Sequence, residues 1–142
     1  MDKALGLLGL ARKGSRIELG EEAAGGACRS SKARLLLLAS DAGESVKHRA
    51  EYFVRSGKPP LLIAPYTKAE LGSALGRPVC PIAALTDVSL ALAFVKALPE
   101  PERYEDLLHT LEPAVKRVQQ RRKEEKAHRA NVRRGNTHSA AR

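Results

Sequence analysis

Aromatic residues are scarce in this chain. Of its 142 residues none is Trp, three are Tyr and two are Phe. Grooves that hold single-stranded nucleic acid by stacking its bases need several aromatic side chains close together. The composition therefore argues against base stacking as the main mode of any nucleic-acid binding.

Cysteine is almost as rare, with only Cys28 and Cys80. Both lie inside apolar segments, and no CxxC spacing is present. Disulfide frameworks and thiolate metal sites need more cysteines at shorter spacings. We therefore expect two buried, reduced thiols in a cytoplasmic protein.

Long hydrophobic runs are also missing. No apolar run approaches the roughly 20 residues that cross a bilayer. The apolar segment 4–11 resembles a signal peptide only superficially, because its main positive charges, Arg12 and Lys13, follow the run instead of preceding it. We expect this segment to be the first helix, and we expect no membrane partner.

Familiar catalytic motifs are absent from the sequence. There is no GxGxxG, no Walker loop and no HExxH, and the four histidines are far apart in the sequence. We therefore expect no enzyme, no cofactor and no small-molecule substrate. Asp41, Glu44 and His48 are close enough in sequence to form a metal site, but a helix N-cap with a solvated face explains the same residues.

Acidic residues are few in the last part of the chain, which concentrates the positive charge there. The net charge is +9, and residues 116–142 contain ten Lys or Arg against two Glu, a net of +8. The first 115 residues are therefore nearly neutral. A cationic segment of this kind favours a phosphate backbone without specifying its sequence. The candidate phosphate-binding residues are Lys116, Arg117, Arg121, Arg122, Lys123, Lys126, Arg129, Arg133 and Arg134.

Helical periodicity alternates with short apolar strands along the first 98 residues. This alternation predicts a three-layer α/β/α sandwich with a small mixed sheet. Pro81 interrupts the last strand and requires an edge position or a bulge. The predicted helices are Lys3–Lys13, Gly20–Ser31, Gly43–Ser56, Thr67–Leu75 and Val88–Leu98, and the predicted strands are Ile17–Leu19, Leu35–Ala39, Leu61–Ala64 and Val79–Leu85.

A different pattern begins at residue 99. Apolar residues from Tyr104 to Val118 recur at helical spacing, with Pro113 at the expected first turn of a second helix. From Gln119 onward the apolar stripe ends, and Arg121/Glu125 and Glu125/Arg129 pairs could sustain a solvated helix. We expect a domain over 1–98, a basic helical extension over 99–130 and a disordered basic tail over 131–142.

Five segments in order, ARKG, GEEA, KARLLLLASDA, TKAELG and IAALTD, resemble the short bacterial members of the ribosomal protein L-seven-Ae / L-thirty-e family. This family consists of small RNA-binding domains that recognise kink-turns and related RNA elbows. The resemblance covers residues 1–98. It implies a non-catalytic, ribosome-associated protein that binds structured RNA, with ribosomal RNA and ribosomal proteins as expected partners.

The resemblance also implies where RNA binds. In the family the start of one helix reads tandem sheared base pairs through a Gly-x-Asn-Glu-x-x-Lys pattern, and an apolar loop packs on a flipped-out base. Here Gly20 matches the glycine, while Glu22, Ala23 and Gly26 stand at the asparagine, glutamate and lysine positions. With the remaining basic residues of this segment and the apolar loop added, the candidate RNA-binding residues are Arg12, Lys13, Arg16, Gly20, Glu21, Glu22, Lys32, Arg34, Pro78, Val79, Cys80 and Pro81.

A second interpretation uses the amphipathic stripe instead. The apolar residues between 104 and 118 could dock on a protein partner in the translation apparatus, while the basic tail binds nucleic acid non-specifically. On this interpretation the chain is a protein-interaction adaptor.

Overall fold

Helices and short strands alternate as the sequence predicts. The computed structural model describes the backbone of residues 2–139 and the side chains of residues 2–133. The elements in order are α1 (Lys3–Lys13), β1 (Ile17–Leu19), α2 (Gly20–Arg29), β2 (Leu35–Leu38), α3 (Glu44–Gly57), β3 (Leu61–Ile63), α4 (Lys68–Leu75), β4 (Ile82–Leu85), α5 (Val88–Lys96), the 3-10 helix η1 (Pro101–Tyr104) and α6 (Glu105–Ser139).

The four strands form one mixed sheet in the order β1-β4-β2-β3. β2 is parallel to β3, whereas β4 is antiparallel to both of its neighbours. All four residues of β2 and of β4 are buried, which explains why neither strand alternates between apolar and polar residues. The three-residue strand β1 lies at one edge of the sheet.

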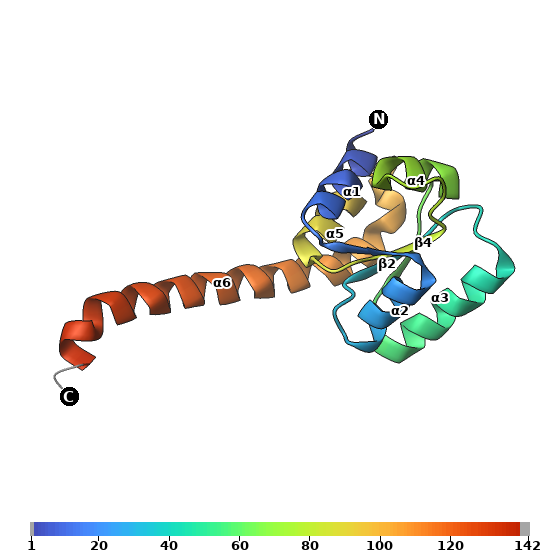
Figure 1. Ribbon diagram of the computed structural model, residues 1–142. Coiled ribbons are helices and arrows are strands. Elements are labelled where there is room, and N and C mark those ends of the chain that lie inside the picture. The colour runs from blue at the N-terminus through green and yellow to red at the C-terminus, as the bar shows by residue number, and fades with distance from the viewer. Residues whose placement is uncertain (1, 140–142) are drawn as a thin grey trace.

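Helices cover both faces of the sheet (Figure 1). α1 packs against α4 and α5 on one face, and α2 packs against α3 on the other. The three-layer α/β/α sandwich predicted from the sequence is therefore confirmed. Within the described residues no helix is both long and apolar enough to cross a membrane.

Two reciprocal hydrogen bonds cap the start of α4. The Thr67 hydroxyl oxygen accepts from the Glu70 amide at 3.1 Å, and the Glu70 carboxylate accepts from the Thr67 amide at 2.9 Å. This reciprocal pair is a capping box. Asp41, considered above as a cap for α3, instead accepts from the Lys68 amide at 2.7 Å, and Gly43 occupies the N-cap of α3.

The position of Pro81 differs from the prediction. β4 begins at Ile82 and lies between β1 and β2, so it is neither an edge strand nor interrupted by the proline. Pro81 directly precedes the strand, and its carbonyl accepts from the Ala39 amide at 2.8 Å. A residue at this position can accept a hydrogen bond from the neighbouring strand without donating one, so the missing N–H of proline does not destabilise the sheet.

Close packing between α2 and α3 explains one of the two adjacent glycines inside α2. A Cβ added at Gly25 would lie 2.6 Å from two ring carbons of Phe53, which is itself buried. The helix therefore tolerates the low helix propensity of glycine because the aromatic ring takes the space of a side chain. Gly26, by contrast, has only Arg29 near its added Cβ, at 3.9 Å.

α6 is one continuous helix, and the predicted break at Pro113 is wrong. Leu111 and Val115, on either side of the proline, are buried in the same core as α5. Burial of these two side chains on one helix face holds the turn together although Pro113 donates no hydrogen bond. The apolar stripe from 104 to 118 is therefore used to attach α6 to the body.

Beyond Val118 the helix leaves the body and projects outward (Figure 1). The backbone is helical to Ser139, where the sequence predicts a disordered tail from residue 131; residues 140–142 lie outside the described part of the chain. The expected pairs of Glu125 with Arg121 and Arg129 are not formed, and Gln120 instead donates to Glu124 at 3.0 Å.

Candidate nucleic-acid interface

The start of α2 and the segment before β4 meet at one end of the sheet. Gly20, the first residue of α2, has a φ of +90°, which favours glycine. A Cβ added there would lie 3.7 Å from Nη1 of Arg77. We call this region the α2–β4 surface, and its residues are Gly20, Glu21, Glu22, Arg77, Pro78 and Val79.

The segment before β4 is pressed against α4. A Cβ added at Gly72 would lie 2.6 Å from the Arg77 carbonyl oxygen and 2.8 Å from the Val79 Cα. This close approach fixes the backbone while the side chains of Pro78 and Val79 point to solvent. Val79 is 50% exposed, one of the few large apolar side chains that the fold leaves open. The structure therefore presents an apolar tip next to the start of α2.

Cys80 faces the interior, which corrects its place in the predicted RNA-binding set. Only 2% of it is exposed, and its thiol donates to the Ile82 carbonyl at 3.3 Å. Burial raises the pKa of the Cys80 thiol, while Arg77 and backbone hydrogen bonds with Ile82 and Gly20 oppose the rise. A neutral, buried thiol supports the loop from inside and offers nothing to a ligand outside.

Glu21 and Glu22 occupy the first turn of α2, where a helix dipole stabilises negative charge. Glu22 is exposed and Glu21 is half-buried. Arg77 is the basic member of the α2–β4 surface, and it was not among the candidate RNA-binding residues predicted from the sequence. Its position in the sequence could have identified it, because Arg77 directly follows Gly76, which ends α4, and begins the loop that the family resemblance identifies.

Arg16 and Arg34 lie at the opposite end of the sheet, whereas Lys32 lines a hollow together with Ala23 and Gly26 of α2. β1 runs from Ile17, beside Arg16, to Leu19, beside Gly20, so Arg16 and Gly20 are separated by roughly 13 Å along the strand. Leu35 pairs with Leu85 at the same end as Ile17, which places Arg34 there too. The predicted site residues are therefore divided between the two ends of the sheet.

Arg12 and Lys13 lie at the same end of the molecule as Arg16. They form the last turn of α1, and the chain returns through Gly14 and Ser15 directly to Arg16. Both side chains are exposed. Pro81 is half-buried directly before β4, at the same end of the sheet as the α2–β4 surface.

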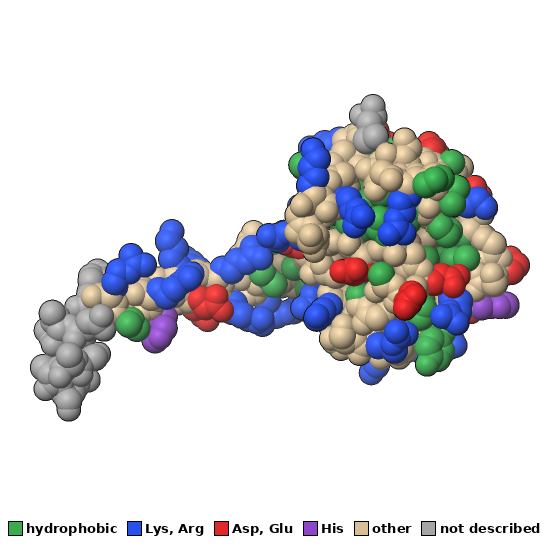
Figure 2. All heavy atoms as spheres, viewed as in Figure 1, with side chains coloured by type: hydrophobic (Ala, Val, Ile, Leu, Met, Phe, Trp, Pro, Cys, Tyr) green, Lys and Arg blue, Asp and Glu red, His purple; other side chains and the backbone are tan. Residues whose placement is uncertain are grey.

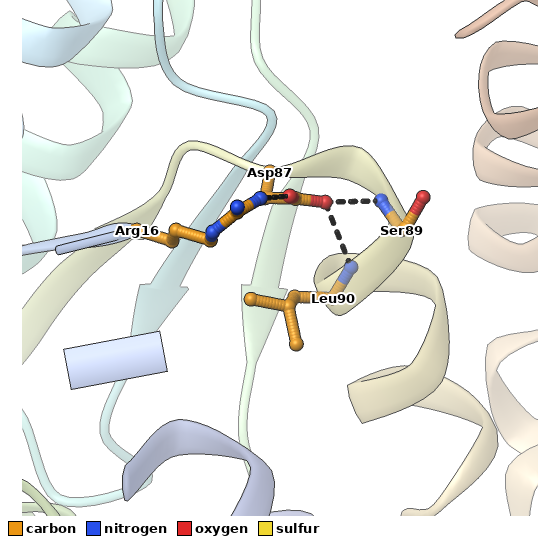
Figure 3. A network of polar contacts seen from close by, with 4 residues as sticks. All are labelled: Arg16, Asp87, Ser89 and Leu90. Atoms are coloured by element: carbon orange, nitrogen blue, oxygen red, sulfur yellow. Dashed lines mark hydrogen bonds and ion pairs between the residues drawn. The ribbon is translucent and has the colours of Figure 1, made fainter. Parts of the chain in front are cut away.

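Arg16 has a structural partner (Figure 3). Its guanidinium pairs with the carboxylate of Asp87, which also caps α5 by accepting from the amides of Ser89 at 2.8 Å and Leu90 at 3.1 Å. Burial alone would raise the pKa of Asp87, but these hydrogen bonds and the Arg16 charge hold that pKa below its usual value. Arg16 thus joins the first strand to the last helix of the body.

The basic residues of the extension lie along α6. Figure 2 shows Lys and Arg side chains following the helix from the body outward. Through Arg133 all of them are exposed, and none is in an ion pair within the described part of the chain. Arg134 belongs to the predicted set, but its side chain lies outside the described residues.

Two solved structures are similar to this fold. A protein of unknown function from Bacillus halodurans is 26% identical, with a TM-score of 0.62, over 68% of this chain and 97% of that one. A 15.5kD RNA binding protein from Giardia lamblia is 18% identical, with a TM-score of 0.55, over 72% of this chain and 85% of that one. No family model and no curated protein matches the chain. The shared fold thus occurs in at least one RNA-binding protein.

Proposed function

We propose that this chain is a non-catalytic, cytoplasmic RNA-binding protein of the bacterial L-seven-Ae / L-thirty-e type. It recognises structured, kink-turn-like RNA through the α2–β4 surface and acts on the ribosome. The basic helix α6 supplies sequence-independent attraction to phosphate. Recognition of RNA shape and overall affinity are thereby divided between the body and the extension.

One observation carries the proposal. Gly20, with its positive φ, begins α2 beside an exposed apolar loop that packs closely against Gly72 and is anchored by the buried Cys80. Backbone and apolar groups held side by side suit an RNA base pulled out of its stack. The fold of the Giardia lamblia RNA binding protein, and the motifs that resemble the family, support RNA as the ligand.

The adaptor interpretation depends on an exposed apolar stripe between residues 104 and 118, and this stripe packs against the core. Leu111 and Val115 of the amphipathic stripe are buried, and Tyr104, Leu107, Leu108 and Val118 pack against the same core. A protein partner would have to displace α6 from α5 to reach them. Within the described residues no group of three or more His, Cys, Asp or Glu is placed to hold a metal ion.

Comparing a kink-turn RNA with a duplex of the same length and scrambled sequence tests the proposal. The full-length protein should bind the kink-turn more tightly at moderate salt, because only that RNA offers a splayed base and an elbow to the α2–β4 surface. Binding should be measured by fluorescence anisotropy at several salt concentrations. Equal affinity for both RNAs across the salt range would reject shape recognition and leave a simple polycation.

Replacing Val79 with alanine should weaken kink-turn binding selectively. Loss of two methyl groups from an apolar contact costs about 1 kcal/mol, or about fivefold in affinity. The scrambled duplex should bind the variant as it binds the parent protein. Ile63→Ala is the matched control, because Ile63 is similarly exposed, at 57%, but lies on β3 at the far edge of the sheet. Equal losses in both variants would contradict a role for Val79.

Replacing Gly26 with lysine should strengthen kink-turn binding. The family resemblance places its phosphate-contacting lysine at this position, and an added Cβ meets nothing closer than 3.9 Å. One new phosphate contact should steepen the dependence of log affinity on log salt by about 0.7 to 0.9. Gly26→Gln tests helix stabilisation without the charge and should leave the slope unchanged. A slope that stays the same in Gly26→Lys would place RNA away from this face of α2.

A further inference from the structure

The side of α6 that packs on the body becomes basic where the body ends. Val118 and Arg122 line one hollow of about 290 Å³ together with Arg16 and Arg34. Residues four, seven and eleven positions after Arg122 share its helix face, since an α-helix turns every 3.6 residues. Those residues are Lys126, Arg129 and Arg133, and all three are exposed.

Two basic surfaces therefore face each other across an inner corner. One belongs to the body, at the end of the sheet opposite the α2–β4 surface, and the other belongs to the projecting helix. We call the set the α6 corner, and it consists of Arg16, Arg34, Arg122, Lys126, Arg129 and Arg133. Along α6 the set extends over about 16 Å, at 1.5 Å per residue.

Acidic groups cancel only part of this charge. Asp87 lines the same hollow, where its carboxylate pairs with Arg16 and accepts from two α5 amides, so the Arg16–Asp87 pair adds no net charge to the corner. Glu125 borders the stripe on α6, where it stands against four positive charges. Arg34 and Arg122 line the hollow, and neither forms an ion pair within the described part of the chain.

We propose that the α6 corner is a second RNA-contact site, which holds the sugar–phosphate backbone of a double-stranded RNA segment. Basic groups on two surfaces set at an angle match a rounded polyanion better than they match a single phosphate. Single-stranded RNA would need aromatic platforms, and none of the residues that line the hollow is aromatic. The inference rests on the proposed RNA-binding function and places a duplex arm opposite the α2–β4 surface.

Two matched double variants of the full-length protein test the corner. Arg122→Gln with Arg129→Gln removes two charges from the corner. Lys116→Gln with Lys123→Gln removes two charges at the same seven-residue spacing, from a different face of α6. All four side chains are exposed and glutamine is a good helix former, so both proteins should fold, which circular dichroism checks.

The probes are a plain RNA duplex, a single strand of the same length, and a kink-turn with a long or a trimmed duplex arm. The corner variant should lose about tenfold in affinity for the plain duplex and for the long-armed kink-turn, and the control should lose less than about threefold. With the trimmed arm the two variants should bind alike. Equal losses on the plain duplex, or a larger corner effect on the single strand, would overturn the proposal. Binding of the plain duplex tests the α6 corner without depending on kink-turn recognition. If kink-turn recognition fails, the parent protein should instead bind the kink-turn and the scrambled duplex equally.

Discussion

Replacing Gly57 with alanine is expected to lower the free energy of unfolding by about 3 kcal/mol or more. The new Cβ would lie 1.9 Å from the carbonyl oxygen of Cys28 and 2.6 Å from its carbonyl carbon. Both contacts are with backbone, so no side chain can rotate away. α3 would have to move from α2, which loosens the packing around Phe53 and Cys28, both buried.

Chemical denaturation measures this loss, and Gly6→Ala provides the control. Gly6 lies inside α1, and a Cβ added there meets nothing within 4 Å. Alanine should therefore raise stability at Gly6 by about 0.5 to 1 kcal/mol, because it favours a helix over glycine. If Gly57→Ala unfolds at the same denaturant concentration as the parent protein, α2 and α3 do not pack as closely as the structure shows.

The glycines show which parts of the fold a sequence reveals. Periodicity and capping residues predict each element, because the buried Leu35–Leu38 run and the Thr67 capping box act locally. Close approach between helices is different. Nothing near Gly25 in the sequence indicates its contact with Phe53, and by propensity alone a glycine disfavours a helix. Pro113 illustrates the same limit, since the burial of Leu111 and Val115 against α5 overrides a local helix breaker.

The candidate site was predictable only in part, because local motifs identify residues but not which of them the fold brings together. Family motifs identified Gly20 and the loop at Pro78 and Val79, and the structure brings these together. Arg16 and Arg34 were candidates for the same surface because they are basic. β1 carries the chain from Arg16 to Gly20 at the other end of the sheet, and Leu35, which follows Arg34, pairs with Leu85 at the Arg16 end. Only the direction and register of β1 and β2 separate the α2–β4 surface from the α6 corner.

Ending the chain after Gln119 is expected to abolish most RNA affinity while the body stays folded. The cut removes eight Lys or Arg and two Glu, and it keeps Leu111, Val115 and Val118, which attach α6 to the core. A cut at Pro101 would remove those buried side chains as well and would confuse unfolding with lost binding. At physiological salt we expect affinity for any duplex RNA to fall by about a thousandfold, because about six phosphate contacts are lost.

A shorter truncation after Arg133 serves as the control for chain length. It removes two arginines, Arg134 and Arg142, and it keeps the α6 corner complete. Affinity for duplex RNA should fall by less than about tenfold, and the salt dependence should stay steep. Thermal unfolding of both truncated proteins should match that of the full chain, since the core residues of α6 remain in each.

The ratio of kink-turn to scrambled-duplex affinity is the decisive quantity in this series. If the body reads RNA shape and α6 supplies phosphate attraction, the ratio should survive the cut after Gln119 although both affinities fall steeply. Contacts at Gly20 and Val79 do not depend on the removed charges, so measurement at low salt should recover them. A ratio that drops to one at every salt concentration would show that the projecting helix, and not the α2–β4 surface, distinguishes one RNA from another.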